Sequence, residues 1–214
     1  MSVPRLLVCG FDSFPEAPRN PSAAVVEALG RDAWSPAGAD VAYLTLPVAW
    51  RGSVEAILVR AARERFEGVL VVGVAVEAEA FRVETLGRNH ADPTRPDHAG
   101  DLWPAALIAP GGPAALPATA PWRSMLAAVA ETGLPVVASD DAGDYLCNFT
   151  LFRLLAEASI PAAGFLHVPQ ARECAAEAAF TLADIDRAVR ACVAAFADDL
   201  AAPLTGPAAG RRTA

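Results

Sequence analysis

The stretch Val69-Leu-Val-Val-Gly-Val74 decides how this chain folds. Its residues are apolar without interruption, and it follows a helical pattern that ends near Arg65. A short continuous apolar run of this kind is typical of a strand that is buried on both faces of a sheet. Since such a sheet needs helices on both sides, we expect Val69–Val74 at the centre of a layered α/β domain.

Strand and helix patterns alternate on either side of this stretch. Short aliphatic runs predict strands, and apolar residues spaced three and four apart predict helices. The predicted strands are Arg5–Gly10, Val41–Val48, Val69–Val74, Pro135–Ser139 and Ala162–Val168. The predicted helices begin at the cap Asn20-Pro21 and cover Ser53–Arg65, closed by Gly68, then Trp122–Glu131, Tyr145–Ala158 and Ala183–Leu200.

The remaining segments are less regular. Residues Ala80–Arg88 alternate weakly, like an exposed hairpin, and the proline-rich stretch Ala91–Pro121 is expected to be mostly loop. No internal repeat or change of composition divides the chain. The sequence therefore predicts a single-domain, three-layer α/β/α sandwich around a mixed, mostly parallel twisted sheet over residues 1–203, with residues 204–214 as a flexible C-terminal tail.

Charge and hydrophobicity exclude several classes of partner. Arginine supplies all 17 basic side chains against 25 acidic ones, so the formal net charge is −8 and we expect neither nucleic acid nor an anionic membrane as a partner. The uncharged run Leu102–Trp122 holds five prolines, which would break a spanning helix. The apolar stretch Leu6–Phe11 is too short for a signal peptide, so a cytoplasmic protein is expected.

The four cysteines are far apart and form no C-x-x-C pair, so neither a disulfide framework nor a zinc site is expected. Cys147 follows a glycine turn and falls in the first turn of a predicted helix, where unpaired N–H groups and the helix dipole stabilise a thiolate. The alternative is that it is a small buried hydrophobic residue. That second interpretation is the one we give to Cys9, Cys174 and Cys192.

A nucleophilic cysteine needs a base, and histidine suits proton transfer near neutral pH. His167 ends a predicted strand, and the carboxyl ends of strands in α/β sheets normally face the active site. His90 and His98 lie in the irregular loop. A carboxylate usually orients the imidazole, and Glu84 is a candidate, although an exposed glutamate on an edge strand is the alternative interpretation.

Four segments, taken together, resemble the pyroglutamyl peptidase type I family. They are Gly10-Phe-Asp-Ser-Phe14 with Asn20-Pro-Ser22, Glu84–Asn89 with Ala91–His98, Ser139–Asn148, and Phe165-Leu-His-Val-Pro169. The resemblance implies that Cys147 is the nucleophile, His167 the base and Glu84 the orienting group.

The same resemblance implies a substrate pocket for N-terminal 5-oxoproline, a flat neutral lactam. Phe11 and Phe14 would sandwich that ring, and Asn20 and Tyr145, which stand in the same motifs, are counted with them as substrate-binding residues. Anchoring of the loop in the core is the alternative role for the two phenylalanines.

The chain departs from the family pattern in three places. Gly73–Ala78 lacks the glutamine, double glycine and arginine of the family segment, and Thr94 replaces an arginine. Arg95 stands one place later and is expected to face the other way, as neighbours in an extended segment do.

The third departure is a set of aspartates near the nucleophile, Asp140, Asp141 and Asp144. If they line the pocket, they would favour a cationic substrate group, and if they point to solvent, screening weakens their effect. Asp144 could also cap the helix by accepting a hydrogen bond from the Cys147 N–H.

The resemblance implies a cysteine exopeptidase that uses no cofactor or metal and acts as a homo-oligomer, a dimer or tetramer, on a peptide or small amide. Two alternatives stay open: a divergent hydrolase of another amide or lactam, and a non-catalytic binding protein. A rival set of possible metal ligands matches no metal signature. Its members are His90, Asp92, Asp97, His98 and Asp101.

Overall fold

The computed structural model describes residues 3–202, which form a six-stranded sheet in the order β2-β1-β3-β8-β4-β7. Four neighbouring strands, β2, β1, β3 and β8, are parallel, whereas β4 is antiparallel to β8 and parallel to β7. The strands are β1 (Arg5–Phe11), β2 (Asp40–Leu46), β3 (Gly68–Val74), β4 (Phe81–Glu84), β7 (Val136–Ser139) and β8 (Ala163–Val168). The predicted mixed, mostly parallel sheet is confirmed.

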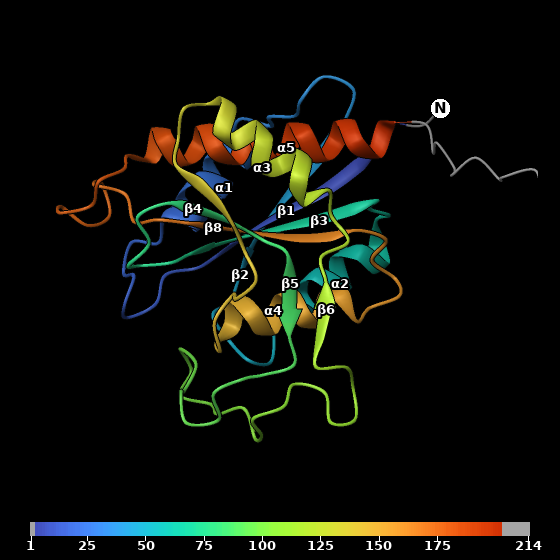
Figure 1. Cartoon of the computed structure of the whole chain (residues 1–214), viewed down its shortest axis with the longest axis vertical. Coiled ribbons are helices and arrows are strands. Elements are labelled where there is room, and N and C mark those ends of the chain that lie inside the picture. The colour runs from blue at the N-terminus through green and yellow to red at the C-terminus, as the bar shows by residue number, and fades with distance from the viewer. Residues whose placement is uncertain (1–2, 203–214) are drawn as a thin grey trace, which may run out of the picture.

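Helices cover both faces of this sheet, which confirms the predicted three-layer sandwich (Figure 1). One face carries α1 (Pro21–Arg31), α3 (Trp122–Glu131) and α5 (Leu182–Ala201), and the other carries α2 (Ser53–Arg63) and α4 (Leu146–Leu155). A separate pair of strands, β5 (Leu86–Arg88) and β6 (Ala115–Pro117), packs against α4. The predicted tail at residues 204–214 lies outside the described residues.

Strand β3 is the central element that its sequence predicts. Every residue from Gly68 to Val74 is buried. Leu70 and Val72 belong to the core beneath α1, α3 and α5, while Val69 and Val71 belong to the core on the α2 and α4 side. Because successive side chains of a strand point to opposite faces, a strand between two cores must be apolar at every position.

The prediction of an exposed hairpin at Ala80–Arg88 is wrong. Strand β4 lies inside the sheet between β8 and β7, and β5 leaves the sheet to pair with β6. Phe81 and Val83 are fully buried in the core beneath α1, α3 and α5. The alternate residues, Arg82 and Glu84, are polar because their face of the strand lies at a pocket and not because the strand is at the surface.

Gly68 does not close the preceding helix, as the sequence pattern had indicated. Helix α2 ends at Arg63, and Gly68 is the first residue of β3. A Cβ atom at Gly68 would lie 2.6 Å from Phe196 and 2.7 Å from Leu6, so this glycine allows α5 to pack closely on the sheet. The structure also adds β6 to a segment that the sequence predicted as mostly loop.

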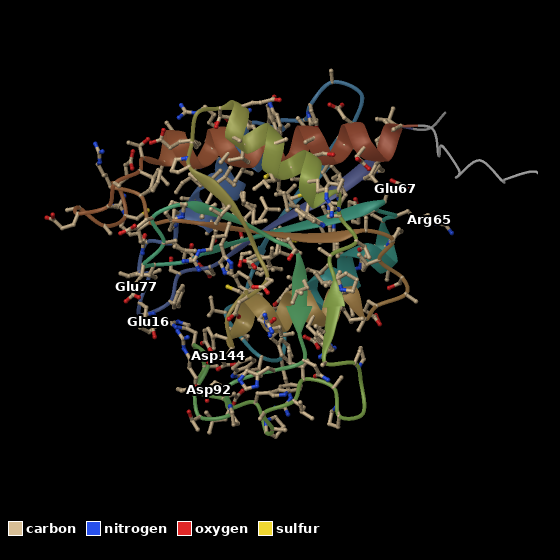
Figure 2. The ribbon with its side chains drawn as sticks, viewed as in Figure 1. Glu16, Arg65, Glu67, Glu77, Asp92 and Asp144 are labelled. Carbon is tan, nitrogen blue, oxygen red and sulfur yellow. The ribbon has the colours of Figure 1, made fainter. Side chains whose placement is uncertain are left out.

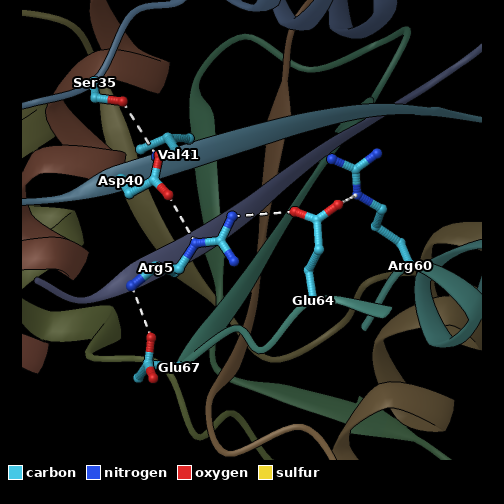
Figure 3. Close-up of polar contacts among 7 residues, drawn as sticks. All are labelled: Arg5, Ser35, Asp40, Val41, Arg60, Glu64 and Glu67. Carbon is cyan, nitrogen blue, oxygen red and sulfur yellow. Dashed lines mark hydrogen bonds and ion pairs between the residues drawn. The ribbon is translucent and has the colours of Figure 1, made fainter. Parts of the chain in front are cut away.

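Ion pairs hold the amino ends of β1 and β2 near the end of α2 (Figure 3). The Arg5 guanidinium lies 2.7 Å from Asp40 and 3.1 Å from Glu64, and Glu64 also pairs with Arg60 at 2.9 Å. The Arg5 backbone N–H donates to Glu67 at 2.7 Å. These side chains are half-exposed, so the network contributes to strand alignment more than to stability. Among residues 3–202, no helix combines the length and apolar character needed to cross a bilayer.

The close contact between β1 and α1 yields a prediction for Gly10→Ala. A Cβ atom at this position would lie 2.6 Å from the Ser22 carbonyl oxygen, so α1 would have to move away from the sheet. We expect a loss of about 1–3 kcal/mol in the free energy of unfolding, measured by urea denaturation. An unchanged midpoint with an unchanged slope would contradict this packing.

Candidate active site

The candidate nucleophile lies at the start of α4, above the carboxyl ends of β3 and β8. Gly143, with φ of +84°, makes the turn that leads into this helix, and Cys147 is the second helical residue. Among the described residues, no backbone or side-chain oxygen accepts a hydrogen bond from the N–H groups of Leu146 or Cys147. These N–H groups and the helix dipole can stabilise negative charge at the sulfur or beside it.

His167 and Glu84 form a buried hydrogen bond next to this thiol. The His167 Nδ1 atom lies 2.8 Å from Oε1 of Glu84, which is fully buried, while His167 is 6% exposed. Glu84 is paired with Phe165 in the β4–β8 ladder, so it reaches His167 on the diagonal of an antiparallel pair. The alternative interpretation of Glu84 as an exposed edge residue is therefore wrong.

The charges around His167 change its pKa. Burial is the largest influence and lowers the pKa, but attraction and hydrogen bonding by Cys147, together with those of Glu84, outweigh it and raise the pKa to about 9. Since Glu84 occupies Nδ1, the other ring nitrogen is left for the sulfur. At neutral pH the ring is therefore protonated, and it can stabilise a thiolate.

The substrate-binding residues predicted from sequence all line one pocket of about 650 Å³ at this edge of the sheet. The pocket contains Phe11, Phe14, Asn20, Tyr145, Cys147 and His167, and Glu84 lies behind His167. Asn20 also caps α1, because its side-chain oxygen accepts from the Ser22 N–H at 3.0 Å. Its amide nitrogen donates to the Asp12 carbonyl at 2.9 Å, which fixes the loop that carries Phe14.

Gly73 is a site residue whose role the sequence analysis missed. A Cβ atom at this position would lie 3.0 Å from the Cys147 sulfur and 2.7 Å from the Phe165 ring. Gly73 is paired with His167 in the β3–β8 ladder, so both lie on the face that meets the thiol. The signal was a glycine inside the otherwise β-branched and aliphatic run Val69–Val74, since an interior glycine often marks a close approach of other atoms.

The aspartates near Cys147 are divided between the pocket mouth and an ion pair, and all three are exposed. Asp141 and Asp144 line the mouth of the pocket, whereas Asp140 lies 3.3 Å from the Arg88 guanidinium. Asp144 does not cap α4 as proposed from the sequence, because Tyr145 is the residue before the helix and no side chain caps it. The Asp144 carbonyl instead accepts from the Asp92 N–H at 2.8 Å.

Arg95 lines the pocket, so the prediction that it faces away is wrong. The segment is not extended, because Asp92 accepts hydrogen bonds from the N–H and hydroxyl groups of Thr94 at 2.8 and 2.7 Å and so forms a tight turn. The Arg95 guanidinium lies 3.9 Å above the Tyr145 ring and 3.8 Å from Glu16. A one-residue displacement therefore does not reverse the direction of the side chain here.

The long segment after β5, which contributes Arg95 to the pocket lining, is held by buried hydrogen bonds. The Asp97 carboxylate is buried and accepts from the N–H groups of Trp50, Ala99 and Asp101, each at 2.9 Å. The Pro96 carbonyl accepts from the Tyr145 hydroxyl at 3.0 Å.

A buried asparagine ties the start of the same segment to the catalytic helix. Asn148, the residue after Cys147, accepts from the Arg88 N–H at 2.8 Å and donates to the carbonyls of Arg88 and His90 at 2.8 and 2.7 Å. These hydrogen bonds therefore fix Cys147 relative to the segment that begins at Arg88.

The possible metal ligands between His90 and Asp101 do not form a metal site in the described residues. Within residues 3–202, no three side chains of histidine, cysteine, aspartate or glutamate are placed to hold a metal ion together. Asp97 turns inward to backbone N–H groups, while His90 and His98 are exposed. The other cysteines lie away from the pocket, and burial raises the pKa of Cys9 and Cys192 and, less strongly, that of Cys174.

A thiol at a helix start beside a histidine that is hydrogen-bonded to a buried carboxylate is an arrangement typical of cysteine hydrolases. Comparison with known proteins agrees. The family model of pyroglutamyl peptidase matches residues 4–198, so the chain belongs to the pyroglutamyl peptidase family.

Individual relatives match over most of their length. The chain is 33% identical to a pyrrolidone-carboxylate peptidase of Levilactobacillus brevis over 91% of the chain and 100% of that protein. It is 37% identical to one of Deinococcus radiodurans, over 78% of each. A solved structure of a mutant pyrrolidone carboxyl peptidase from Pyrococcus furiosus superposes with a TM-score of 0.84 at 25% identity, over 92% of this chain and 99% of that one.

The role of Asp97 can be tested with Asp97→Ala. Removing the carboxylate leaves the N–H groups of Trp50, Ala99 and Asp101 without their acceptor, so we expect the free energy of unfolding to fall by about 2 kcal/mol. Chemical denaturation measures this change. The matched control is Asp101→Ala in the same segment, whose exposed carboxylate accepts no hydrogen bond from the described residues, and it should change stability by less than about 0.5 kcal/mol. Equal losses in both variants would contradict the role of Asp97.

The pKa of His167 is predicted to fall in both Glu84→Gln and Cys147→Ala, because each change removes a neighbour that raises it from the ordinary value of 6.5. Titration of the imidazole signals by NMR measures the shift, with Glu131→Gln on α3 as a control that should leave the pKa unchanged. Because the folded-state pKa is raised, protonation of His167 stabilises the fold. That contribution is complete below pH 6.5 and is lost as the pH rises through about 9. A pKa that stays constant in Glu84→Gln would exclude the carboxylate as a cause.

Proposed function

We propose that this protein is a cysteine exopeptidase that hydrolyses the amide bond after an N-terminal pyroglutamyl residue through Cys147, His167 and Glu84. The observation that carries the proposal is the His167–Glu84 hydrogen bond beside Cys147 at the floor of a pocket. The names of the relatives, pyrrolidone-carboxylate peptidase, support the choice of substrate.

The first half of the reaction forms an acyl-enzyme. The Cys147 thiolate attacks the carbonyl carbon, and its proton resides on His167. The N–H groups at the start of α4 stabilise the oxyanion that forms. His167 then donates its proton to the amide nitrogen, the carbon–nitrogen bond breaks, and the amine leaves a thioester on Cys147.

The second half releases the acid. His167, now neutral, accepts a proton from water as the oxygen attacks the thioester carbon. The carbon–sulfur bond breaks, pyroglutamic acid leaves, and the proton on His167 restores the thiolate–imidazolium pair. Glu84 holds the imidazole in the orientation that both halves need, since it accepts from Nδ1.

The pocket walls support a flat and largely apolar acyl group. Phe11 and Phe14 line the pocket together with Val48, Val74 and Val76. Aromatic and aliphatic walls suit a neutral lactam ring, which needs few polar partners. Val74 stands where the family segment has glutamine. This replacement favours a second candidate function, the hydrolysis of a different small amide or lactam.

Location and assembly follow as part of the same proposal. A catalytic thiolate stays reduced in the cytoplasm, so we propose a cytoplasmic enzyme. The homo-oligomer, a dimer or tetramer, and the absence of nucleic-acid and membrane partners stay predictions from the sequence.

The test is release of a fluorescent aminocoumarin from its pyroglutamyl amide. Cys147→Ala and His167→Ala should lower kcat by about a thousandfold or more, and Glu84→Gln by at least about a hundredfold. Cys174→Ala, which removes a half-buried thiol outside the pocket, is the matched control and should keep full activity. The corresponding prolyl amide, which lacks the lactam carbonyl, should not be cleaved.

Other results would separate the alternatives. A folded protein that cleaves no pyroglutamyl amide, but whose Cys147 is alkylated near neutral pH, would point to a different amide substrate. Absence of both cleavage and alkylation would refute the hypothesis that Cys147 is a catalytic nucleophile, and it would favour a binding protein on the same fold.

A further inference from the structure

Arg82 is a pocket residue that the proposed mechanism does not use. It lies opposite His167 in the β4–β8 ladder, two residues before Glu84, so all three side chains belong to one face of the sheet. Phe81 and Val83 are buried on the other face. The alternation therefore directs Arg82 to the pocket, which it lines.

Arg82 is a partly buried residue, and its guanidinium makes no ion pair or hydrogen bond with the described residues. The other arginine of the pocket, Arg95, is placed over Tyr145 and beside Glu16. A pocket guanidinium without an anion is a ready binding group for one, and its planar donors match the two oxygens of a carboxylate.

The strand order shows which part of a substrate Arg82 would meet. His167 is on β8, and Phe11 is on β1, two strands away on one side, while Arg82 is on β4, the next strand on the opposite side. If the acyl group lies between Phe11 and Phe14, the scissile bond is at Cys147 and His167. The released residue then extends toward β4 and Arg82.

We propose that Arg82 binds a carboxylate on the residue that follows the pyroglutamyl group, either its α-carboxylate or an acidic side chain, and so selects anionic leaving residues. The proposal rests on the proposed function, because it assigns the leaving side of the same pocket.

Four exposed carboxylates line the pocket, and three of them oppose this selection, since the fourth, Glu16, lies 3.8 Å from the Arg95 guanidinium. Glu77, Asp141 and Asp144 line the mouth and are exposed, and in Figure 2 Glu77 and Asp144 lie on the same side of the molecule as Glu16. Asp141 already accepts from the Gly143 N–H at 3.0 Å. Exposed charges are screened by solvent and salt, whereas a guanidinium in the pocket acts on its ligand at contact. A preference for cationic leaving residues is thus the competing outcome.

Two pairs of substrates isolate the charge and its source. The first pair is pyroglutamyl-alanine with a free C-terminus and its C-terminal amide, which tests the α-carboxylate. The second is pyroglutamyl-glutamate amide and pyroglutamyl-glutamine amide, which tests an acidic side chain. We expect kcat/KM to favour the carboxylate member of at least one pair by about tenfold.

The variants then assign this preference to Arg82. Arg82→Gln should remove the preference, and Arg82→Lys should keep part of it, because an ammonium retains the charge without the planar fork. Arg65→Gln is the matched control. Arg65, an exposed residue, likewise makes no ion pair or hydrogen bond with the described residues. It lies on the opposite side of the molecule from Glu77 in Figure 2, and the variant should keep the full preference. Thermal unfolding confirms that each variant is folded.

The results separate the two proposals. If wild type cleaves the neutral amides but Arg82→Gln leaves both ratios unchanged, the role of Arg82 is wrong and the proposed function stands. A wild-type preference for pyroglutamyl-lysine amide over the glutamine amide would overturn the role of Arg82 in favour of the mouth carboxylates. If wild type cleaves none of the substrates, the proposed function fails and the inference fails with it.

Discussion

The hydrogen bond between His167 and Glu84 is the interaction on which the site depends. Glu84 is fully buried, and only one of its two carboxylate oxygens has a hydrogen-bond partner among the described residues. A buried charge of this kind is costly unless an opposite charge compensates it. Protonated His167 supplies that charge, and the sulfur of Cys147 attracts the same imidazolium. Glu84 and Cys147 therefore both favour the protonated state of the imidazole that lies between them.

The direction of β4 makes this arrangement possible. Because β4 runs antiparallel to β8, Arg82 lies opposite His167 and Glu84 lies opposite Phe165, with both polar side chains on the α4 face. Gly73, on the other neighbour of β8, clears the space that the sulfur occupies. Cys147 thus lies over three adjacent strands, β3, β8 and β4, which contribute Gly73, His167 and Glu84.

Sequence reasoning predicted the elements whose pattern reflects the core and missed those whose pattern reflects the pocket. The uninterrupted apolar run of β3 has one explanation, burial on both faces. The alternation in β4 has two explanations, because a strand whose polar residues face a pocket has the same sequence pattern as one whose polar residues face solvent. The direction of Arg95 depended on a turn made by Asp92, which local spacing does not reveal. Local position had already made Cys147, His167 and Glu84 candidates, each with an alternative role, and the family motifs connected them, since no local pattern links positions so far apart.

The segment around Asp97 is held in place by buried hydrogen bonds before any ligand arrives. A preformed segment does not have to be ordered on binding, so little conformational entropy is lost when a substrate enters. Recognition then depends on the shape and polarity that the pocket already has before the substrate binds. On this side of the pocket, binding is then expected to need no ordering of the backbone.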